Sequence, residues 1–166
     1  TADVILRFRK NLASIKLLGV DPKEGGKFWG FRDGMIIGSL DQLVEKLSYE
    51  KKYLPGIILG EQLVYKLNLD LGDEVEVLNP QVGTSEVLSG QSPSSKFRLI
   101  GIFLTALHDY DSRYAVVSID QGRKYLADYD KSLDEEKYVS GLAIKIQNPY
   151  FVDEYIKPLK KLSNLG

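Results

Sequence analysis

One short stretch holds the residues whose types could do chemistry. His108, the single histidine of the chain, is followed by Asp109 and then by Asp111. An imidazole with two carboxylates can hold a divalent cation or transfer a proton, as in a small hydrolase or a metal enzyme. However, neighbours along an extended segment point to opposite sides, so His108 and Asp109 are not expected to converge. We favour a polar turn in which Asp111 forms a local salt bridge with Arg113.

Other motifs of catalysis or cofactor binding do not appear. The chain has no cysteine, which excludes disulfides, thiolate metal sites and cysteine nucleophiles. Gly25 and Gly26 lack the Lys-Ser/Thr pair of a phosphate-binding loop, and Ser39, Ser89 and Ser118 lack the Gly-x-Ser-x-Gly pattern. We therefore predict a protein that is not an enzyme, with no catalytic residue, no metal and no cofactor.

Size and charge narrow the class further. The 166 residues are enough for one compact domain or two small subdomains. The net charge is −1 and the basic residues are scattered among acids, which disfavours a nucleic-acid partner. No run approaches the roughly 18 apolar residues of a membrane helix. Because the first residue is Thr1, we expect a fragment of a longer protein.

Residues 55–78 organise the rest of the chain. The apolar run 57–59 predicts a buried strand, and Gly60 permits a sharp turn after it. Residues 61–67 have helical apolar spacing, and Asn68 can end the helix in a left-handed conformation. In residues 74–78, glutamates and valines alternate, which predicts a strand with one polar and one apolar face.

The same reasoning gives the other elements. Ser39 with Gln42 forms a capping box before a helix. Phe28, Trp29 and Phe31 are expected to cap the edge of the core. Further strands are predicted at 4–8, 14–19, 35–38, 97–104, 114–119 and 141–147, and further helices from Asp120 and Asn148. The chain is therefore expected to be α+β with a mixed sheet.

Residues 80–96 are the best candidate for a functional segment. They are rich in Ser, Gly and Thr and far exceed the usual hairpin loop. If residues 97–104 pair with residues 74–78, this segment forms a projecting β-hairpin arm. Its apolar residues Val82, Val87 and Leu88 are consistent with a partner surface, and equally with a hairpin tip that binds nothing.

Three stretches, in order, resemble one known family. They are GVDP at 19–22, GIILGEQLVYKLNLDLGDEVEVL at 56–78 and FRLIGIFLTALHDYDSRYAVVSI at 97–119. Together they resemble the periplasmic domain of ABC transporter permeases, most closely the lipoprotein-releasing permeases of the LolC/LolE type. The wider group contains the MacB-type efflux permeases and FtsX-like proteins.

The resemblance implies a MacB-like periplasmic core domain with two lobes. Residues 1–34 and 120–166 would form an outer lobe, incomplete at its N-terminus. Residues 35–119 would form an inserted lobe that carries the arm at 80–96 as a hook. The sequence departs from the family at Glu76, where a basic residue can occur.

The resemblance also implies a function on the periplasmic face of the inner membrane. The permease would release lipoproteins and hand them to a periplasmic lipoprotein carrier. Its partners would be the lipoprotein cargo, a second permease subunit and cytoplasmic ATPase subunits. The long segment at 80–96 favours this over the alternative, a MacB-type efflux permease that binds an adaptor protein. The predicted contact residues are Pro80, Val82, Thr84, Val87, Leu88, Gln91, Pro93 and Ser94.

Overall fold

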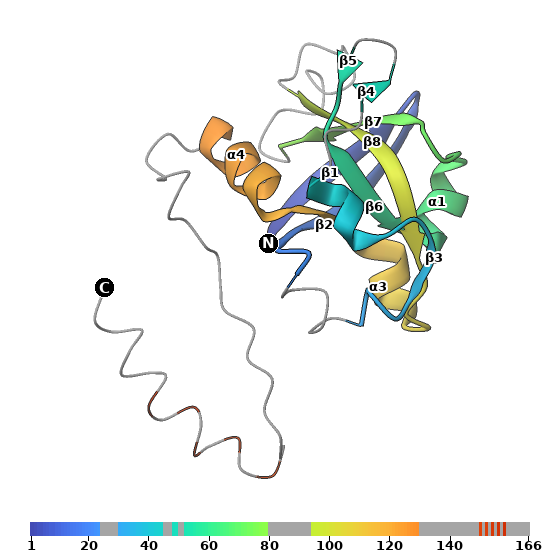
Figure 1. The fold of residues 1–166 in the computed structure, drawn as a ribbon. Coiled ribbons are helices and arrows are strands. Elements are labelled where there is room, and N and C mark those ends of the chain that lie inside the picture. The colour runs from blue at the N-terminus through green and yellow to red at the C-terminus, as the bar shows by residue number, and fades with distance from the viewer. Residues whose placement is uncertain are drawn as a thin grey trace.

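The computed structural model describes residues 1–23, 30–44, 48, 49, 52–79, 94–129 and, further on, 150, 152, 154, 156 and 158. Figure 1 shows the arrangement of the elements. The strands are β1 (Ala2–Phe8), β2 (Asn11–Val20), β3 (Met35–Ile37), β4 (Ser48–Tyr49), β5 (Lys52–Tyr53), β6 (Gly56–Gly60), β7 (Glu74–Leu78), β8 (Ser94–Phe103) and β9 (Tyr114–Ser118). The helices are the 3-10 helix η2 (Leu40–Val44), α1 (Glu61–Leu67), α3 (His108–Arg113) and α4 (Ile119–Tyr129).

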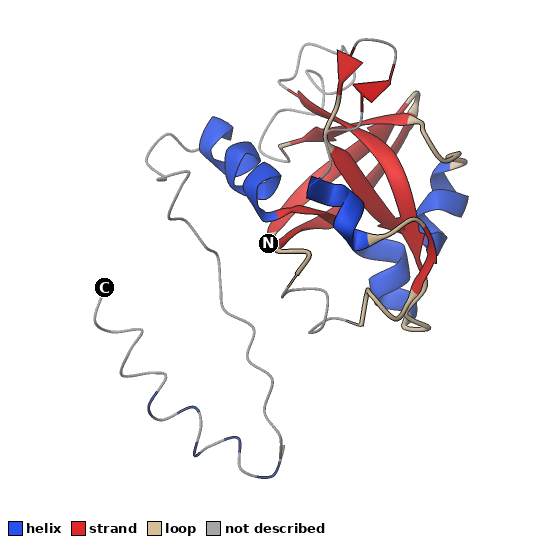
Figure 2. Cartoon of the chain, viewed as in Figure 1, coloured by secondary structure: helices blue, strands red, loops and turns tan. Residues whose placement is uncertain are grey.

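The main sheet closes on itself (Figure 2). Its strand order is β3-β8-β6-β9-β2-β1-β7, and β7 also pairs with β8. All of these strands except β3 therefore form a closed ring. β3 lies outside this ring and pairs with β8. The pairs β2–β9 and β6–β8 are parallel and the others antiparallel, which confirms the mixed sheet of an α+β fold. A closed ring leaves its strands without a free edge.

Alternation along the strands fills the interior of the barrel. In β1, Val4 and Leu6 are buried, while Arg7 faces outward. In β7, Val75 and Val77 are fully buried between the outward glutamates, as the alternating pattern predicts. Further buried core side chains come from the other strands of the ring and from α1 and α4, including Ile15, Ile57, Leu63, Phe97, Leu99, Val117 and Tyr125.

A second apolar layer covers the outside of β6, β8 and β9. Ile58 and Val116 face outward and are nevertheless fully buried, because Leu40 of η2 packs over them in one cluster. Phe31 belongs to this layer and lies 4.6 Å from Phe103, measured between ring centroids. The expectation that Phe31 caps the core is confirmed, whereas Phe28 and Trp29 lie outside the described residues.

Both predicted helix signals near these strands are confirmed. The Ser39 backbone N–H donates to Gln42 Oε1 at 3.0 Å, and Ser39 Oγ accepts from the Asp41 N–H at 3.2 Å. The helix that follows is a 3-10 helix within the described residues. Asn68 ends α1 in the left-handed region, with φ of 54°.

Other predictions have mixed outcomes. β8 begins at Ser94, so the last three residues of the predicted arm belong to a strand. α4, the helix that follows β9, begins at Ile119, and the Gln121 N–H donates to Ser118 Oγ at 3.4 Å, so the cap precedes the predicted Asp120. The predicted strand 141–147 lies outside the described residues, as does the start of the helix expected from Asn148.

The sheet joins strands from both of the predicted lobes. β1 and β2 come from residues 1–34, and they pair with β7 and β9 of residues 35–119. The division into an outer and an inserted lobe stays a prediction. Among the described residues, no helix has the length and apolar character needed to cross a membrane.

Candidate protein-interaction site at the base of the 79–93 connection

The predicted pairing of the strands around the long connection is confirmed. β7 and β8 are antiparallel, and Leu78 opposite Ser94 is the last pair before the connection. Residues 79–93 therefore leave the barrel and return to it at neighbouring positions. Asn79 is the last described residue on one side and Ser94 the first on the other.

The predicted contact residues fall almost entirely in that connection. Ser94 is half-buried at the first position of β8, where its backbone pairs with β7. The other predicted residues lie outside the described part of the chain, namely Pro80, Val82, Thr84, Val87, Leu88, Gln91 and Pro93. What the structure defines is the surface from which they emerge.

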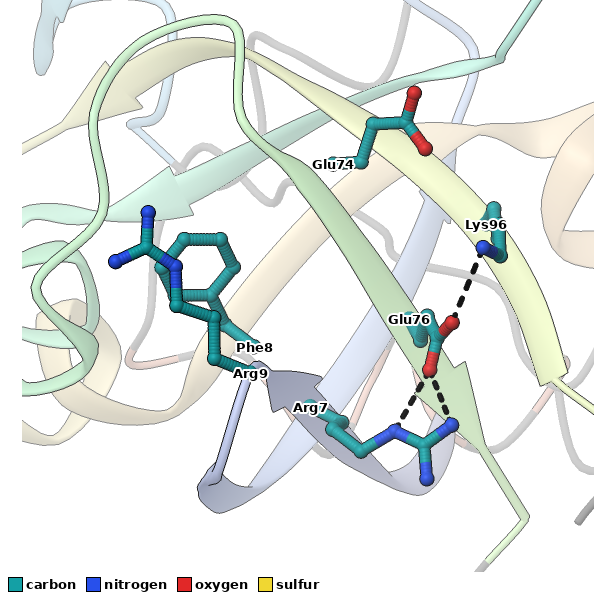
Figure 3. Close-up of a pocket in the computed structure, with 6 residues that line it drawn as sticks. All are labelled: Arg7, Phe8, Arg9, Glu74, Glu76 and Lys96. Carbon is teal, nitrogen blue, oxygen red and sulfur yellow. Dashed lines mark hydrogen bonds and ion pairs between the residues drawn. The ribbon is translucent and has the colours of Figure 1, made fainter. Parts of the chain in front are cut away.

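A row of charges crosses three strands at this surface (Figure 3). The register places Arg7 of β1 opposite Glu76 of β7, and Glu76 opposite Lys96 of β8. Arg7 Nε donates to Glu76 Oε2 at 2.7 Å, and Arg7 Nη2 donates to the same oxygen. Lys96 Nζ lies 3.3 Å from Glu76 Oε1. One carboxylate thus ties together β1, β7 and β8.

A second charged pair stands beside this row. Arg98 is opposite Glu74, and its Nη2 donates to Glu74 Oε1 at 3.4 Å. Arg98 Nη1 also donates to the carbonyl oxygen of Gly72 at 3.1 Å, which fixes the turn before β7. Opposite charges on directly facing positions stabilise the pairing of two antiparallel strands.

The environment of Glu76 keeps it ionised. Partial burial acts to raise the pKa of Glu76, but the hydrogen bond and charge of Arg7, together with Lys96, outweigh it. The pKa of Glu76 therefore lies below its ordinary value of 4.5. The carboxylate is only 23% exposed, so its ion pairs are partly shielded from water.

The charged row borders a hollow of about 330 Å³. Arg7, Phe8 and Arg9 line it from β1 and the following turn, and Glu74, Glu76 and Lys96 line it from β7 and β8 (Figure 3). The Arg9 guanidinium lies over the Phe8 ring, 4.8 Å from its centroid. These groups can offer hydrogen bonds and charges to a partner, but none is a nucleophile held by a base.

Sequence reasoning singled out Glu76 here and missed Arg7 and Lys96. The signal for Arg7 was present, because Arg7 lies between the buried residues Leu6 and Phe8 and so belongs to the outer face of its strand. The ion pair of Arg7 with Glu76 depends on the pairing of β1 with β7, and sequence periodicity carries no information about which strands pair.

The three residues of the alternative enzyme hypothesis do not form one site. Residues 108–113 form the helix α3 and not the expected turn. Asp111 is 2% exposed, and it accepts hydrogen bonds from the Thr105 N–H and from Thr105 Oγ1, both at 2.8 Å. His108 and Asp109 are exposed beside α1.

The predicted ion pair of Asp111 with Arg113 is wrong. Within the described residues, Asp111 is held by Thr105 and Arg113 makes no salt bridge. The helix turns the Asp111 carboxylate toward the loop that precedes it, whereas Arg113 lies at the exposed surface. No group of three His, Cys, Asp or Glu side chains suited to a metal ion occurs in the described part of the chain.

Comparison with known proteins finds similarity to part of one curated membrane protein. The chain matches no protein-family model. It is 28% identical over 152 residues to the lipoprotein-releasing system transmembrane protein LolC of Xylella fastidiosa strain Temecula1, and equally to LolC of strain 9a5c. The chain is similar to part of LolC. Each alignment covers 84% of this chain and 34% of the relative, so the chain spans about a third of the length of these relatives.

This similarity supports the interpretation of the chain as a LolC-like region. LolC is named as a transmembrane protein of a lipoprotein-releasing system. The similarity extends over most of the chain, so it includes much more than the three stretches 19–22, 56–78 and 97–119.

Proposed function

We propose that the chain is the periplasmic domain of a lipoprotein-releasing ABC permease, which passes lipoproteins from the inner membrane to a periplasmic carrier. The observation that carries this proposal is the similarity to LolC over 84% of the chain. In this account the domain performs no covalent chemistry. ATP hydrolysis takes place on cytoplasmic subunits, and a second permease subunit completes the transporter.

The 79–93 connection is the contact segment of this proposal. Its two ends are held at Leu78 and Ser94 by strands of a closed barrel. The ion pairs of Glu76 with Arg7 and Lys96 add a cross-link directly beneath it. A segment anchored in this way can transmit a movement of the barrel to a bound partner, because its base does not bend separately from the sheet.

Removal of the contact segment tests the proposal. Deletion of residues 82–91 leaves five residues between Leu78 and Ser94, a length that hairpin loops commonly have. The barrel is therefore expected to fold, and affinity for the purified periplasmic lipoprotein carrier should fall about tenfold or more. Isothermal titration calorimetry measures the affinity, and circular dichroism checks the fold.

A second variant keeps the length of the connection. Val82→Ser, Val87→Ser and Leu88→Ser together remove its apolar side chains, and we expect a similar loss of affinity. The control is Lys66→Glu on α1, an exposed position at the opposite end of the barrel from Ser94, which should bind the carrier as the unmodified chain does. Unchanged carrier affinity in the deletion variant, or binding to an efflux adaptor and not to the carrier, would contradict the proposal.

A further inference from the structure

The largest hollow described at the other end of the barrel is not used by the proposed function. β6 and β8 run parallel and end together, where Gly60 pairs with Phe103. α1 follows β6 and α3 follows β8 after a short loop, so both helices lie at this end (Figure 1). The 79–93 connection returns at Ser94, the opposite end of β8, roughly 30 Å away for a strand of this length.

α1, α3 and the start of β2 border an open surface hollow of about 680 Å³. α1 contributes Tyr65 and Lys66, α3 contributes His108 and Arg113, and β2 contributes Leu12. The helices contact each other, and Gly60 lets the backbone of α3 approach closely, because a Cβ there would lie 2.7 Å from Asp111 Cα. The positions of α1 and α3 on either side of the hollow are therefore fixed by their packing against each other and against the end of β6.

The side chains at its rim have the character of an interface. Tyr65 is 86% exposed and Leu12 is 38% exposed, so both present apolar surface to solvent. Lys66 and Arg113 are exposed, and within the described residues no salt bridge occupies either of them. Tyrosine and arginine are enriched among the residues that dominate binding energies.

The charge around the hollow selects the kind of partner. The lining holds two cations, Lys66 and Arg113, and Asp109 is its single acid. The chain as a whole carries a net charge of −1, so this positive excess is local. Adsorption to anionic lipid through charge generally uses clusters of about four to eight basic residues, more than this concave surface has.

We infer that this surface, defined by Leu12, Tyr65, Lys66, His108 and Arg113, binds an acidic segment of a partner protein that carries an aromatic or aliphatic side chain. The apolar side chain packs against Tyr65 and Leu12 in the hollow. Carboxylates of the segment pair with Lys66 and Arg113 at its rim. The site is separate from the 79–93 connection, so the chain has two protein contacts at opposite ends of the barrel.

A peptide probe tests this inference on the full 166-residue chain. The probe is a short fluorescent peptide in which glutamates flank one phenylalanine, and its partner probe has glutamine at every glutamate. Fluorescence anisotropy should show saturable binding of the first peptide only. Lys66→Glu, Arg113→Glu and Tyr65→Ala should each weaken it about tenfold.

Two matched controls make the test specific. Lys124→Glu is the same charge reversal on α4, and it should leave the affinity unchanged. Deletion of residues 82–91 should also leave it unchanged, so that failure of this inference is distinguishable from failure of the proposed function.

Several results would overturn the inference. These are equal binding of the glutamate and glutamine peptides, an equal loss in Lys124→Glu and Lys66→Glu, or no saturable binding. Two further results assign the surface to another occupant and so also overturn it. One is a dimer in sedimentation that Lys66→Glu abolishes, and the other is co-sedimentation with phosphatidylglycerol vesicles that Lys66→Glu abolishes while the peptide does not bind.

Discussion

Glu76 is the residue on which the base of the connection depends. It receives hydrogen bonds from Arg7 and lies in contact with Lys96, so it joins β1 to both strands of the hairpin. A carboxylate whose pKa is lower in the folded state stabilises that state above the pKa of the unfolded chain. The stabilisation is lost as the pH falls through the folded pKa.

The lowered pKa of Glu76 leads to a prediction about stability at low pH. Glu76→Gln should lower the free energy of unfolding by about 1 kcal/mol at neutral pH, because it removes two partly shielded ion pairs. The difference from the unmodified chain should shrink as the pH falls below the ordinary value of 4.5 and through the lowered pKa of Glu76. Urea unfolding across this range measures it, and a difference independent of pH would contradict the role of the charge.

Asp111 gives a second prediction, of a structural kind. Asp111→Ala leaves the N–H and hydroxyl of Thr105 without their acceptor, which should cost about 1–3 kcal/mol in unfolding free energy. His108→Ala, at an exposed neighbour in the same helix, should change it by less than about 0.5 kcal/mol. Equal losses in the two variants would show that Asp111 has no special part in holding the loop.

At the scale of single strands and helices, the sequence predicted those elements that depend on neighbouring residues alone. Alternation located β1 and β7, the apolar run located β6, and the capping box at Ser39 has the expected hydrogen bond from the Ser39 N–H to Gln42 Oε1. α3 was missed because its helix lies in a polar stretch whose apolar spacing is weak. The carboxylate that holds it, Asp111, is buried by contacts with α1 and β6 that are distant in sequence.

The approach of α3 to the end of β6 leads to a prediction for Gly60. Its backbone angles suit any residue, since φ is −67°, but a Cβ would collide with the backbone of Asp111. Gly60→Ala should therefore lower the unfolding free energy by about 1–3 kcal/mol, because α3 has to move away from the end of β6. Thermal unfolding measures the loss, and a stability equal to that of the unmodified chain would refute this packing.

At the scale of the whole molecule, closure of the barrel turns a set of predicted strands into one body. The sequence indicated a mixed sheet and the pairing of residues 74–78 with the strand after the connection. It did not indicate that β1 pairs with β7 or that β2 pairs with β9, because such long-range pairings leave no periodic trace. The row of Arg7, Glu76 and Lys96 is a product of this closure.

The central claim is that the barrel holds residues 79–93 in position to contact the periplasmic lipoprotein carrier. The most direct measurement places a photo-activated cross-linking amino acid at Val87, and at Lys66 at the opposite end of the barrel as a control, in the permease. We predict a cross-link to the carrier from position 87 and none from position 66. Cross-links of equal yield from both positions, or none from position 87 while lipoprotein release proceeds, would contradict it.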